Sequence, residues 1–312
     1  MVQENSVKGK LVIILGPTAS GKTELSLEVA KRLNGEIVSA DSMLIYKGLD
    51  VGTAKPTSEE MSVYPHHMID IISPTDPYTV FDYSKKAKEI VDDILCRGKT
   101  PIICGGTGFY IKSIIYNLSY GNNADTSEIR EQYKRLIEEK GKEYVFDILK
   151  EKDPQSAEKL HYNDVKRVIR ALEICDSGTV KSSLNDSLAP VYDFDAYTFD
   201  FDREELYQRI NLRVDRMFQN GLLSEVQSLL DSGIDNSFQC MQGIGYKEVY
   251  SYIKGELSFD EMVELLKKNT RNYAKRQITF FKKFENLTHL DPKINLSKNV
   301  DLIVSKYYEK EY

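Results

Sequence analysis

The chain has 312 residues, with 42 Lys or Arg against 48 Asp or Glu, and a net charge of −6. This length suits one large domain or two smaller ones, and the apolar content is that of a globular protein with a sizeable core. An acidic chain does not bind nucleic acid over its whole surface, so any such contact must come from a local basic patch. No run has the apolar length of a signal peptide or a membrane-spanning helix, which predicts a cytoplasmic enzyme without a membrane partner.

A phosphate-binding loop follows the first predicted strand, residues 11–15. Its sequence is Gly16-Pro17-Thr18-Ala19-Ser20-Gly21-Lys22-Thr23, and a helical pattern begins near its end. This is the G-x-x-x-x-G-K-[ST] pattern in the strand-loop-helix context that it requires. In such loops backbone N–H groups converge on phosphate, Lys22 adds a full positive charge, and the Thr23 hydroxyl can reach Mg²⁺. The pattern predicts a polyphosphate ligand but leaves open whether phosphate is the group transferred or the group that leaves.

A carboxylate stands at the end of the second predicted strand, residues 36–40. Asp41 follows this strand directly. In open α/β sheets ligands bind beyond the carboxyl ends of the strands, so Asp41 is expected near the phosphate loop. There it could hold a metal-bound water or act as a general base. An aspartate that only caps the next turn is the alternative.

Residues 46–80 are rich in Gly, Pro, Thr and Tyr and are predicted as a loop over the site, and residues 69–72 are compatible with a short strand. The adjacent His66 and His67 point in different directions and have no third ligand nearby. This favours packing or hydrogen bonding over metal binding.

The third buried strand is predicted at residues 100–104, after a helix over 81–96, and it leads into Gly105-Gly106-Thr107. Glycines at this edge let a backbone approach a ligand closely, and Thr107 offers a hydroxyl. A plain strand-to-helix turn explains the glycines almost as well.

The segment 120–196 is predicted as an all-helical insertion. Its helices are expected at residues 127–140, 142–150, 154–160 and 165–175, with a polar loop over 176–190. The expected fold class is therefore α/β: a P-loop NTPase-like core over 1–119 and 197–312, with a parallel sheet flanked by helices, and a small inserted helical domain.

Cations on the last predicted helix of the insertion lie away from its apolar face. They are Lys166, Arg167 and Arg170. On position alone, an ordinary solvated face is favoured over anion binding.

A helix that begins near Arg203 places Arg213 at the margin of its buried stripe. The stripe consists of Leu206, Ile210, Val214 and Met217. An arginine so placed either extends to solvent or points its guanidinium at a buried anion, and the pattern does not choose between them.

The helix predicted over residues 260–285 carries the strongest local excess of positive charge. Its apolar face is expected to consist of Met262, Leu266, Tyr273, Phe280 and Phe284. The opposite face carries Lys268, Arg271, Lys275 and Lys282. On an acidic chain this face is the best candidate for a nucleic-acid contact, because a merely solvated face more often mixes both signs.

In this order the motifs resemble those of the tRNA dimethylallyltransferases, also called tRNA isopentenyltransferases, over nearly the whole chain. They are the phosphate loop, Asp41-Ser42 with Tyr46, Gly52-Thr53-Ala54-Lys55-Pro56, Pro65 to Asp70, Gly105-Gly106-Thr107, Arg167 to Glu173, Gly243-Ile244-Gly245-Tyr246 and Thr270 to Gln277. Kinases and many other NTPases share the phosphate loop, whereas the ordered set is much more specific.

The resemblance implies transfer of the dimethylallyl group of dimethylallyl diphosphate to N6 of the tRNA adenosine 3′ of the anticodon, position 37. Diphosphate is then the leaving group. The resemblance implies that Asp41 acts as general base, that Arg213 neutralises the leaving group, and that Thr107 forms a hydrogen bond where the two substrates meet. The implied diphosphate contacts are Gly16, Thr18, Ala19, Ser20, Gly21, Lys22 and Thr23, with Thr23 helping to place Mg²⁺.

The resemblance also implies contacts with the tRNA anticodon stem-loop, which reverses the interpretation of the 166–170 cations as a solvated face. The implied contacts are Asp41, Ser42, Met43, Leu44, Thr107, Arg130, Lys166, Arg167, Val168, Ile169, Arg170, Lys268, Arg271 and Lys275. The absence of a zinc-finger extension in this sequence indicates the bacterial type, and we expect a monomer.

Two alternatives stay open at this point. A P-loop kinase of a nucleoside or small metabolite could use Arg167 and Arg170 as lid arginines, but its third strand would be expected to end in a magnesium-binding Asp. An adenylate isopentenyltransferase acting on free nucleotide would need no basic helix face, so that face favours tRNA.

Overall fold

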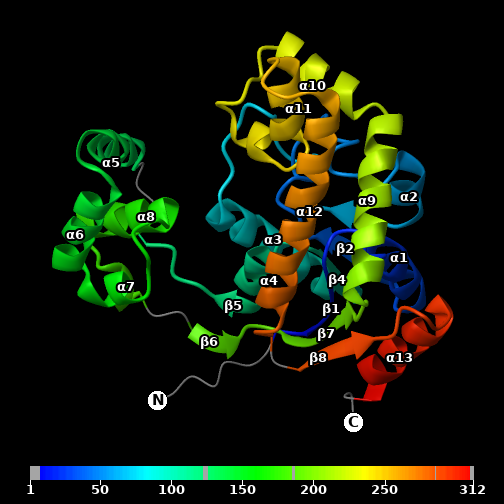
Figure 1. Cartoon of the computed structure of the whole chain (residues 1–312). Helices are drawn as coiled ribbons and strands as arrows, with labels where there is room; N and C mark the ends of the chain where they lie inside the picture. The colour runs from blue at the N-terminus through cyan, green and yellow to red at the C-terminus, as the bar shows by residue number, and fades with distance from the viewer. Residues whose placement is uncertain (1–7, 122–125, 185–186, 285, 310–312) are drawn as a thin grey trace, which may run out of the picture. The chain divides into compact units, whose positions relative to one another are not determined.

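A parallel sheet organises the larger of two units in the computed structural model (Figure 1). The structure describes residues 8–121, 126–184, 187–284 and 286–309. The core unit consists of Met1–Ile115 and Val191–Tyr312, and the helical unit consists of Tyr116–Pro190. The helical unit overlaps the predicted insertion, whose expected last residues instead belong to a strand of the core unit.

The described residues of the core unit form one sheet with the strand order β3-β2-β4-β1-β7-β8, in which all neighbours are parallel. The strands are β1 (Lys10–Leu15), β2 (Gly35–Ser39), β3 (His66–His67), β4 (Thr100–Gly105), β7 (Asp193–Phe199) and β8 (Leu287–Leu290). Nearly every residue of β1, β2 and β4 is buried, as expected for parallel strands that are covered on both faces.

Helices cover both faces of this sheet and extend beyond its edge (Figure 1). The helices of the core unit are α1 (Lys22–Arg32), α2 (Ser58–Val63), α3 (Val80–Cys96), α4 (Gly108–Ile115), α9 (Arg203–Gln219), α10 (Leu222–Asp231), the 3₁₀ turn η2 (Gln239–Gln242), α11 (Tyr246–Ile253), α12 (Phe259–Phe281) and α13 (Leu296–Glu309). Leu25 and Val29 of α1 and Ile303 of α13 pack in one cluster with Val12 and Ile14 of the sheet.

A second hydrophobic cluster holds α9, α10, α11 and α12 together with the loop over residues 43–51. Tyr46 and Leu49 of this loop pack with Val226, Val249 and Leu266 from three of the helices. The cluster anchors α9 and the loop, both of which supply groups to the candidate site.

The helical unit has its own small core. It contains β5 (Tyr116–Asn117), α5 (Ser127–Lys140), α6 (Lys142–Lys152), α7 (Pro154–Glu158), α8 (Val165–Asp176), the 3₁₀ turn η1 (Lys181–Ser183) and β6 (Ser187–Pro190). Val145 and Leu149 of α6 pack against Val168 and Leu172 of α8. Within the described ranges of both units, every helix is too short or too polar to cross a membrane.

Several local predictions were wrong. The 46–80 segment, predicted as a loop, contains α2 and β3. The strand in this region is His66–His67, and of the predicted strand at 69–72 only Ile72 forms a bridge, which is isolated. The 176–190 loop includes η1 and β6, so the insertion is not purely helical. Short pairings of this kind depend on partner strands far along the chain, which a local pattern does not reveal.

The buried face of α12 also differs from the predicted one. Beyond Leu266 its buried residues are Thr270, Ala274, Gln277 and Phe281, whereas Tyr273, Phe280 and Phe284 are only partly buried. The polar Gln277 is buried because its amide has two backbone partners, as described below. Hydrophobic periodicity cannot predict that a polar residue is buried in this way.

A buried carboxylate ties β2 to β3 and to the turn between α3 and β4. Glu36 of β2 accepts hydrogen bonds from Arg97 (2.7 Å from Nη2), Lys99 (2.7 Å) and His67 of β3 (2.8 Å). The Arg97 guanidinium, with Lys99 and His67, holds the pKa of this carboxyl well below its ordinary value, against the opposing effect of burial. His67 therefore makes the hydrogen-bonding contact that was predicted in preference to metal binding.

We expect Glu36→Gln to lower the free energy of unfolding at pH 7 by roughly 1–3 kcal/mol, because charged donors lose their buried partner. Since the folded pKa is depressed, the carboxylate stabilises the protein above its unfolded pKa of about 4.3 and loses this effect as the pH falls. The difference from wild type should therefore shrink on acidification. Urea unfolding from pH 7 down to about pH 3 measures both quantities, because the loss sets in only below the unfolded pKa.

The control is Glu89→Gln, which removes an exposed carboxylate that pairs with Lys86 at 3.8 Å. It should change the unfolding free energy by less than about 0.5 kcal/mol. A Glu36→Gln deficit that stays constant with pH would contradict this role for Glu36.

Candidate active site

The phosphate loop connects β1 to α1 and keeps the shape of an anion cradle. Ala19 and Gly21 adopt left-handed φ angles of 64° and 82°. The Ser20 hydroxyl is buried and has no hydrogen-bond partner within the part of the chain that the structure describes. Lys22 curls back over the loop and donates from Nζ to the Pro17 carbonyl at 2.7 Å. A buried hydroxyl without a partner in such a loop fits a ligand that supplies one.

Two cations, Lys22 and Arg213, line the same cavities. Arg213 of α9 points inward and donates from Nη2 to the Thr53 carbonyl at 3.0 Å, which decides between the two orientations that the sequence left open. Burial, reinforced by the charge of Arg213, lowers the pKa of the Lys22 ammonium to about 8, and Asp41 only partly opposes this effect. Burial also lowers the pKa of Arg213. The site therefore holds poorly solvated positive charge, which favours an anionic ligand.

Asp41 and Thr107 follow β2 and β4 and meet at the sheet edge. The Asp41 Oδ1 accepts the Met43 N–H at 2.8 Å, as a capping aspartate would, but its carboxylate also lines a cavity. The Thr107 Oγ1 accepts the Ser42 N–H at 3.2 Å, and the Thr107 N–H donates to the Ala40 carbonyl at 3.0 Å. Thr107 thus holds the backbone that carries the Asp41 carboxylate.

Gln277 of α12 joins the two glycine-containing loops. Its Oε1 accepts the Thr18 N–H at 3.1 Å, and its Nε2 donates to the Gly106 carbonyl at 2.9 Å. A Cβ added at Gly106 would lie 2.2 Å from this Nε2, and one at Gly105 would lie 2.2 Å from the Ala40 oxygen. The two glycines at the end of β4 are therefore required because Gln277 and the Ala40 backbone pack directly against them.

Two cavities of the core unit meet at Lys22, Thr23 and Arg213. One measures about 480 Å³ and is lined by Asp41 and by Tyr273 of α12 among others, and the second measures about 850 Å³. Burial and the charge of Asp41 raise the pKa of Tyr273 to about 12, so its phenol is a hydrogen-bond donor at neutral pH. The smaller cavity is thus lined by cations, by a carboxylate and by a phenol donor.

The basic residues of α12 do not form one free face. Lys268 and Lys275 are exposed, whereas the partly buried Arg271 donates to the Asn211 side chain of α9 at 2.7 Å. Lys267 pairs with Asp215 of α9 at 2.8 Å. Part of the positive charge therefore serves the packing of α12 against α9.

In the helical unit, Lys166 and Arg167 are exposed, and Arg167 pairs at 3.1 Å with Asp164, the N-cap residue of α8. Arg130 and Arg170 both bind the buried Glu173 carboxylate, at 2.6 and 2.9 Å. Of the predicted tRNA contacts in this unit, Val168 and Ile169 are buried in its core, 1% and 5% exposed, so their side chains cannot form a contact surface.

Sequence reasoning missed Gln277 and Tyr273 as residues of the site. Gln277 follows Tyr273 by four positions and therefore lies on the helix face that was predicted to be apolar. A polar amide on such a face was the signal that could have identified it.

Comparison with known proteins identifies the family. A family model described as IPP transferase matches residues 44–284, and one described as isopentenyl transferase matches residues 9–70. This chain belongs to the IPP transferase family. A tRNA dimethylallyltransferase of Acetivibrio thermocellus is 48% identical over 281 residues, which cover 89% of this chain and 90% of that relative. One of Clostridioides difficile is 43% identical over 293 residues, or 93% and 94% of the two chains.

Solved structures agree with this membership. A tRNA delta(2)-isopentenylpyrophosphate transferase from Staphylococcus epidermidis is 41% identical, with a TM-score of 0.71 over 97% of the present chain and 99% of that chain. A eukaryotic dimethylallyltransferase acting on tRNA is 28% identical, with a TM-score of 0.80 over 97% and 80% of the two chains. The P-loop NTPase-like α/β fold expected from the sequence is thereby confirmed.

We expect Gln277→Met to weaken binding of inorganic diphosphate about tenfold and to lower the free energy of unfolding by roughly 1–3 kcal/mol. Methionine keeps the length of the side chain but leaves the Thr18 N–H and the Gly106 carbonyl without their partner. Calorimetric titration and urea unfolding measure the two effects.

The matched control is Ile278→Met, an exposed neighbour on the same helix. It should leave diphosphate affinity and stability unchanged. Wild-type affinity in Gln277→Met would show that the bridge between the two loops does not shape the cradle.

Proposed function

We propose that this protein moves the dimethylallyl group of dimethylallyl diphosphate to N6 of the adenosine at position 37 of tRNA and releases diphosphate. The observation that carries the proposal is the convergence of Lys22, Arg213 and Asp41 on one cavity. The relatives reported above, which are named tRNA dimethylallyltransferases, support the choice of both substrates.

In the proposed reaction the allylic C–O bond breaks and its electron pair goes to the departing diphosphate. The phosphate loop N–H groups, Lys22 and Arg213 are the groups proposed to stabilise this charge, and donors set in place beforehand lower the barrier because they need no reorganisation. The low pKa of unliganded Lys22 reflects this arrangement, since an incoming anion would restore full protonation.

The adenine N6 forms the new C–N bond and gives up one proton, for which Asp41 is the proposed acceptor. Asp41 lines the cavity at the end of β2, and Thr107 fixes the adjacent backbone. Thr107 is further proposed to hydrogen-bond where the two substrates meet. A base placed in this way typically contributes about 10²–10⁴-fold to the rate.

The residues present fit Mg²⁺, which supplies charge neutralisation to the diphosphate when bound. Mg²⁺ prefers oxygen ligands and is commonly held by one or two protein groups together with substrate phosphates and water. Thr23 lines the cavity, and its hydroxyl would be such a group. Within the described ranges, no cluster of three or more His, Cys, Asp or Glu could hold a metal without substrate.

The tRNA acceptor is proposed to be the anticodon stem-loop, with the target base flipped into the cavity because its amine is inaccessible in a stacked loop. Ser42, Met43 and Leu44 line the cavity beside Asp41 and are proposed to contact the flipped nucleotide. Lys268 and Lys275 of α12, with Lys166, Arg167, Arg170 and Arg130 of the helical unit, are the proposed backbone contacts. The monomeric state and cytoplasmic location stay predictions.

We expect Asp41→Asn to lower the rate constant of transfer by about 10²–10⁴-fold while leaving tRNA affinity within about twofold, because the amide cannot accept the proton. The assay follows labelled dimethylallyl diphosphate into unmodified tRNA in the presence of Mg²⁺. Asp200→Asn is the control, since Asp200 also follows a strand of the sheet but is largely exposed. Undiminished turnover in Asp41→Asn would show that Asp41 is not the base. A wild-type protein that labels no tRNA but uses ATP to phosphorylate a small substrate would indicate a kinase.

We expect Lys268→Gln and Lys275→Gln each to weaken tRNA binding and to reduce the slope of log affinity against log salt by about 1, because each lysine neutralises one phosphate. Binding titrations between low and moderate salt give the slope. Lys298→Gln on α13 is the control. An unchanged slope would assign these two lysines to an ordinary solvated surface.

A further inference from the structure

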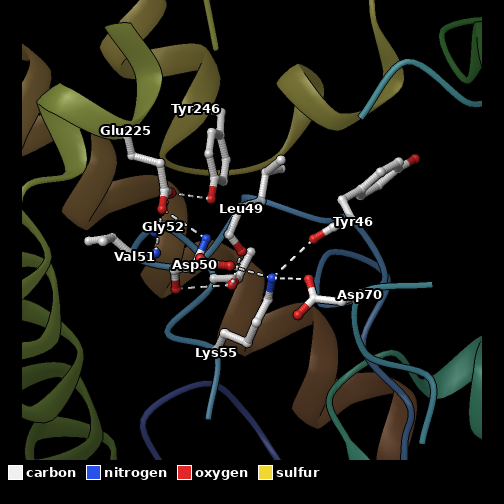
Figure 2. A network of polar contacts seen from close by, with 10 residues as sticks. Tyr46, Leu49, Asp50, Val51, Gly52, Lys55, Asp70, Glu225 and Tyr246 are labelled. Atoms are coloured by element: carbon white, nitrogen blue, oxygen red, sulfur yellow. Dashed lines mark hydrogen bonds and ion pairs between the residues drawn. The ribbon is translucent and has the colours of Figure 1, made fainter. Parts of the chain in front are cut away.

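One carboxylate from α10 holds three consecutive backbone N–H groups of the loop that borders the site. Glu225 accepts hydrogen bonds from Asp50 N (2.8 Å), Val51 N (2.7 Å) and Gly52 N (3.0 Å), as Figure 2 shows. Charge-assisted bonds of this kind are roughly twice as strong as neutral ones. The carboxylate therefore determines the path of the loop at residues 50–52.

Tyr246 holds the same carboxylate from the other side. Its hydroxyl donates to Glu225 Oε1 at 2.7 Å, and its ring lies so close to Gly52 that an added Cβ would approach the ring Cζ to 2.5 Å. Tyr246 is completely buried. Its ring and hydroxyl thus leave the loop and Glu225 little freedom to shift.

A buried lysine anchors the loop at its far end. Lys55, whose side chain is 5% exposed, contacts the Asp50 carboxylate and donates to Asp70 at 2.5 Å and to the Tyr46 carbonyl at 3.1 Å (Figure 2). The segment between Asp50 and Lys55 is therefore held at both ends.

The middle of this segment carries the acceptor that orients Arg213. Gly52, the last residue held by Glu225, precedes Thr53, whose carbonyl accepts the Arg213 Nη2 at 3.0 Å. A guanidinium has five N–H donors, so this contact leaves others for an anion. The position of the Thr53 carbonyl, which the loop determines, thus sets the direction of the Arg213 guanidinium.

We infer that Glu225 is a positioning residue that acts through the 50–53 loop to aim the Arg213 guanidinium at the departing diphosphate. Glu225 lies on α10 and does not line the cavity in which Asp41 and Arg213 meet. Its effect on the site therefore has to pass through the loop. The inference deepens the proposed function and rests on it, because it assigns Arg213 to the diphosphate.

The test is a double-mutant cycle with inorganic diphosphate as the probe. Glu225→Gln turns an amide NH₂ toward N–H groups that need an acceptor, and Arg213→Ala removes the group that Glu225 is inferred to aim. Calorimetric affinities are measured for wild type, both single variants and the double variant. Glu225→Gln should weaken diphosphate binding about tenfold in the wild-type background and less than about twofold in the Arg213→Ala background.

Two further variants keep the test decisive. Tyr246→Phe removes one donor to Glu225 and should give a smaller loss that likewise disappears in the Arg213→Ala background; it replaces Glu225→Gln if that variant does not fold. Glu36→Gln removes a buried carboxylate at the other end of the sheet and should lower stability without altering the effect of Arg213→Ala.

If the two variants weaken diphosphate affinity by factors that multiply in the double variant, the inference is overturned. Multiplying factors mean that Glu225 affects binding independently of Arg213, as a general effect on stability would. The transfer assay separates this outcome from failure of the proposed function. A wild-type protein that transfers label and binds diphosphate, but shows no coupling, contradicts the inference alone. A wild-type protein that binds no diphosphate contradicts both.

Discussion

The parallel alignment of β1, β2 and β4 is the constraint on which the site depends. Because these strands are adjacent and run in the same direction, the segments that follow them leave the sheet at one edge. The phosphate loop, Asp41 and Thr107 are far apart in sequence and meet there for this reason. Hydrogen bonds between these segments, from Thr107 to Ala40 and from Ser42 to Thr107, then fix the edge at the scale of single atoms.

Burial of positive charge is the second feature of the site. Lys22 and Arg213 are held where solvation is poor, and burial lowers the pKa of both groups. Positive charge in such surroundings is unfavourable without an anion and favourable with one. Both cations are therefore already oriented in the folded protein before the substrate binds. The hydrophobic cluster of α9 to α12 makes this possible, because it anchors the helix that carries Arg213 and the loop that receives its hydrogen bond.

The α9 and α12 helices illustrate how far local pattern predicts structure. The four apolar residues of the α9 stripe, Leu206 to Met217, are all buried as predicted, because one side of this helix packs on a hydrophobic core. On α12 the same reasoning was wrong for Tyr273, which borders a cavity, and it did not find Gln277, which is buried between two loops. Periodicity detects burial against apolar surroundings, whereas a site buries polar groups against specific partners.

The sequence by itself determined the phosphate loop, the order of the buried strands and helices around it, the family resemblance, and the position of Asp41 at a strand end. These follow from local patterns of residue type, which do not depend on distant contacts. Only the tertiary structure decided that Arg213 points inward, that Arg271 contacts α9 as well as carrying charge, and that Gln277 and Glu225 hold loops at the site. Each of these is a directional hydrogen bond between residues separated by dozens to hundreds of positions, so it exists only once the chain has folded.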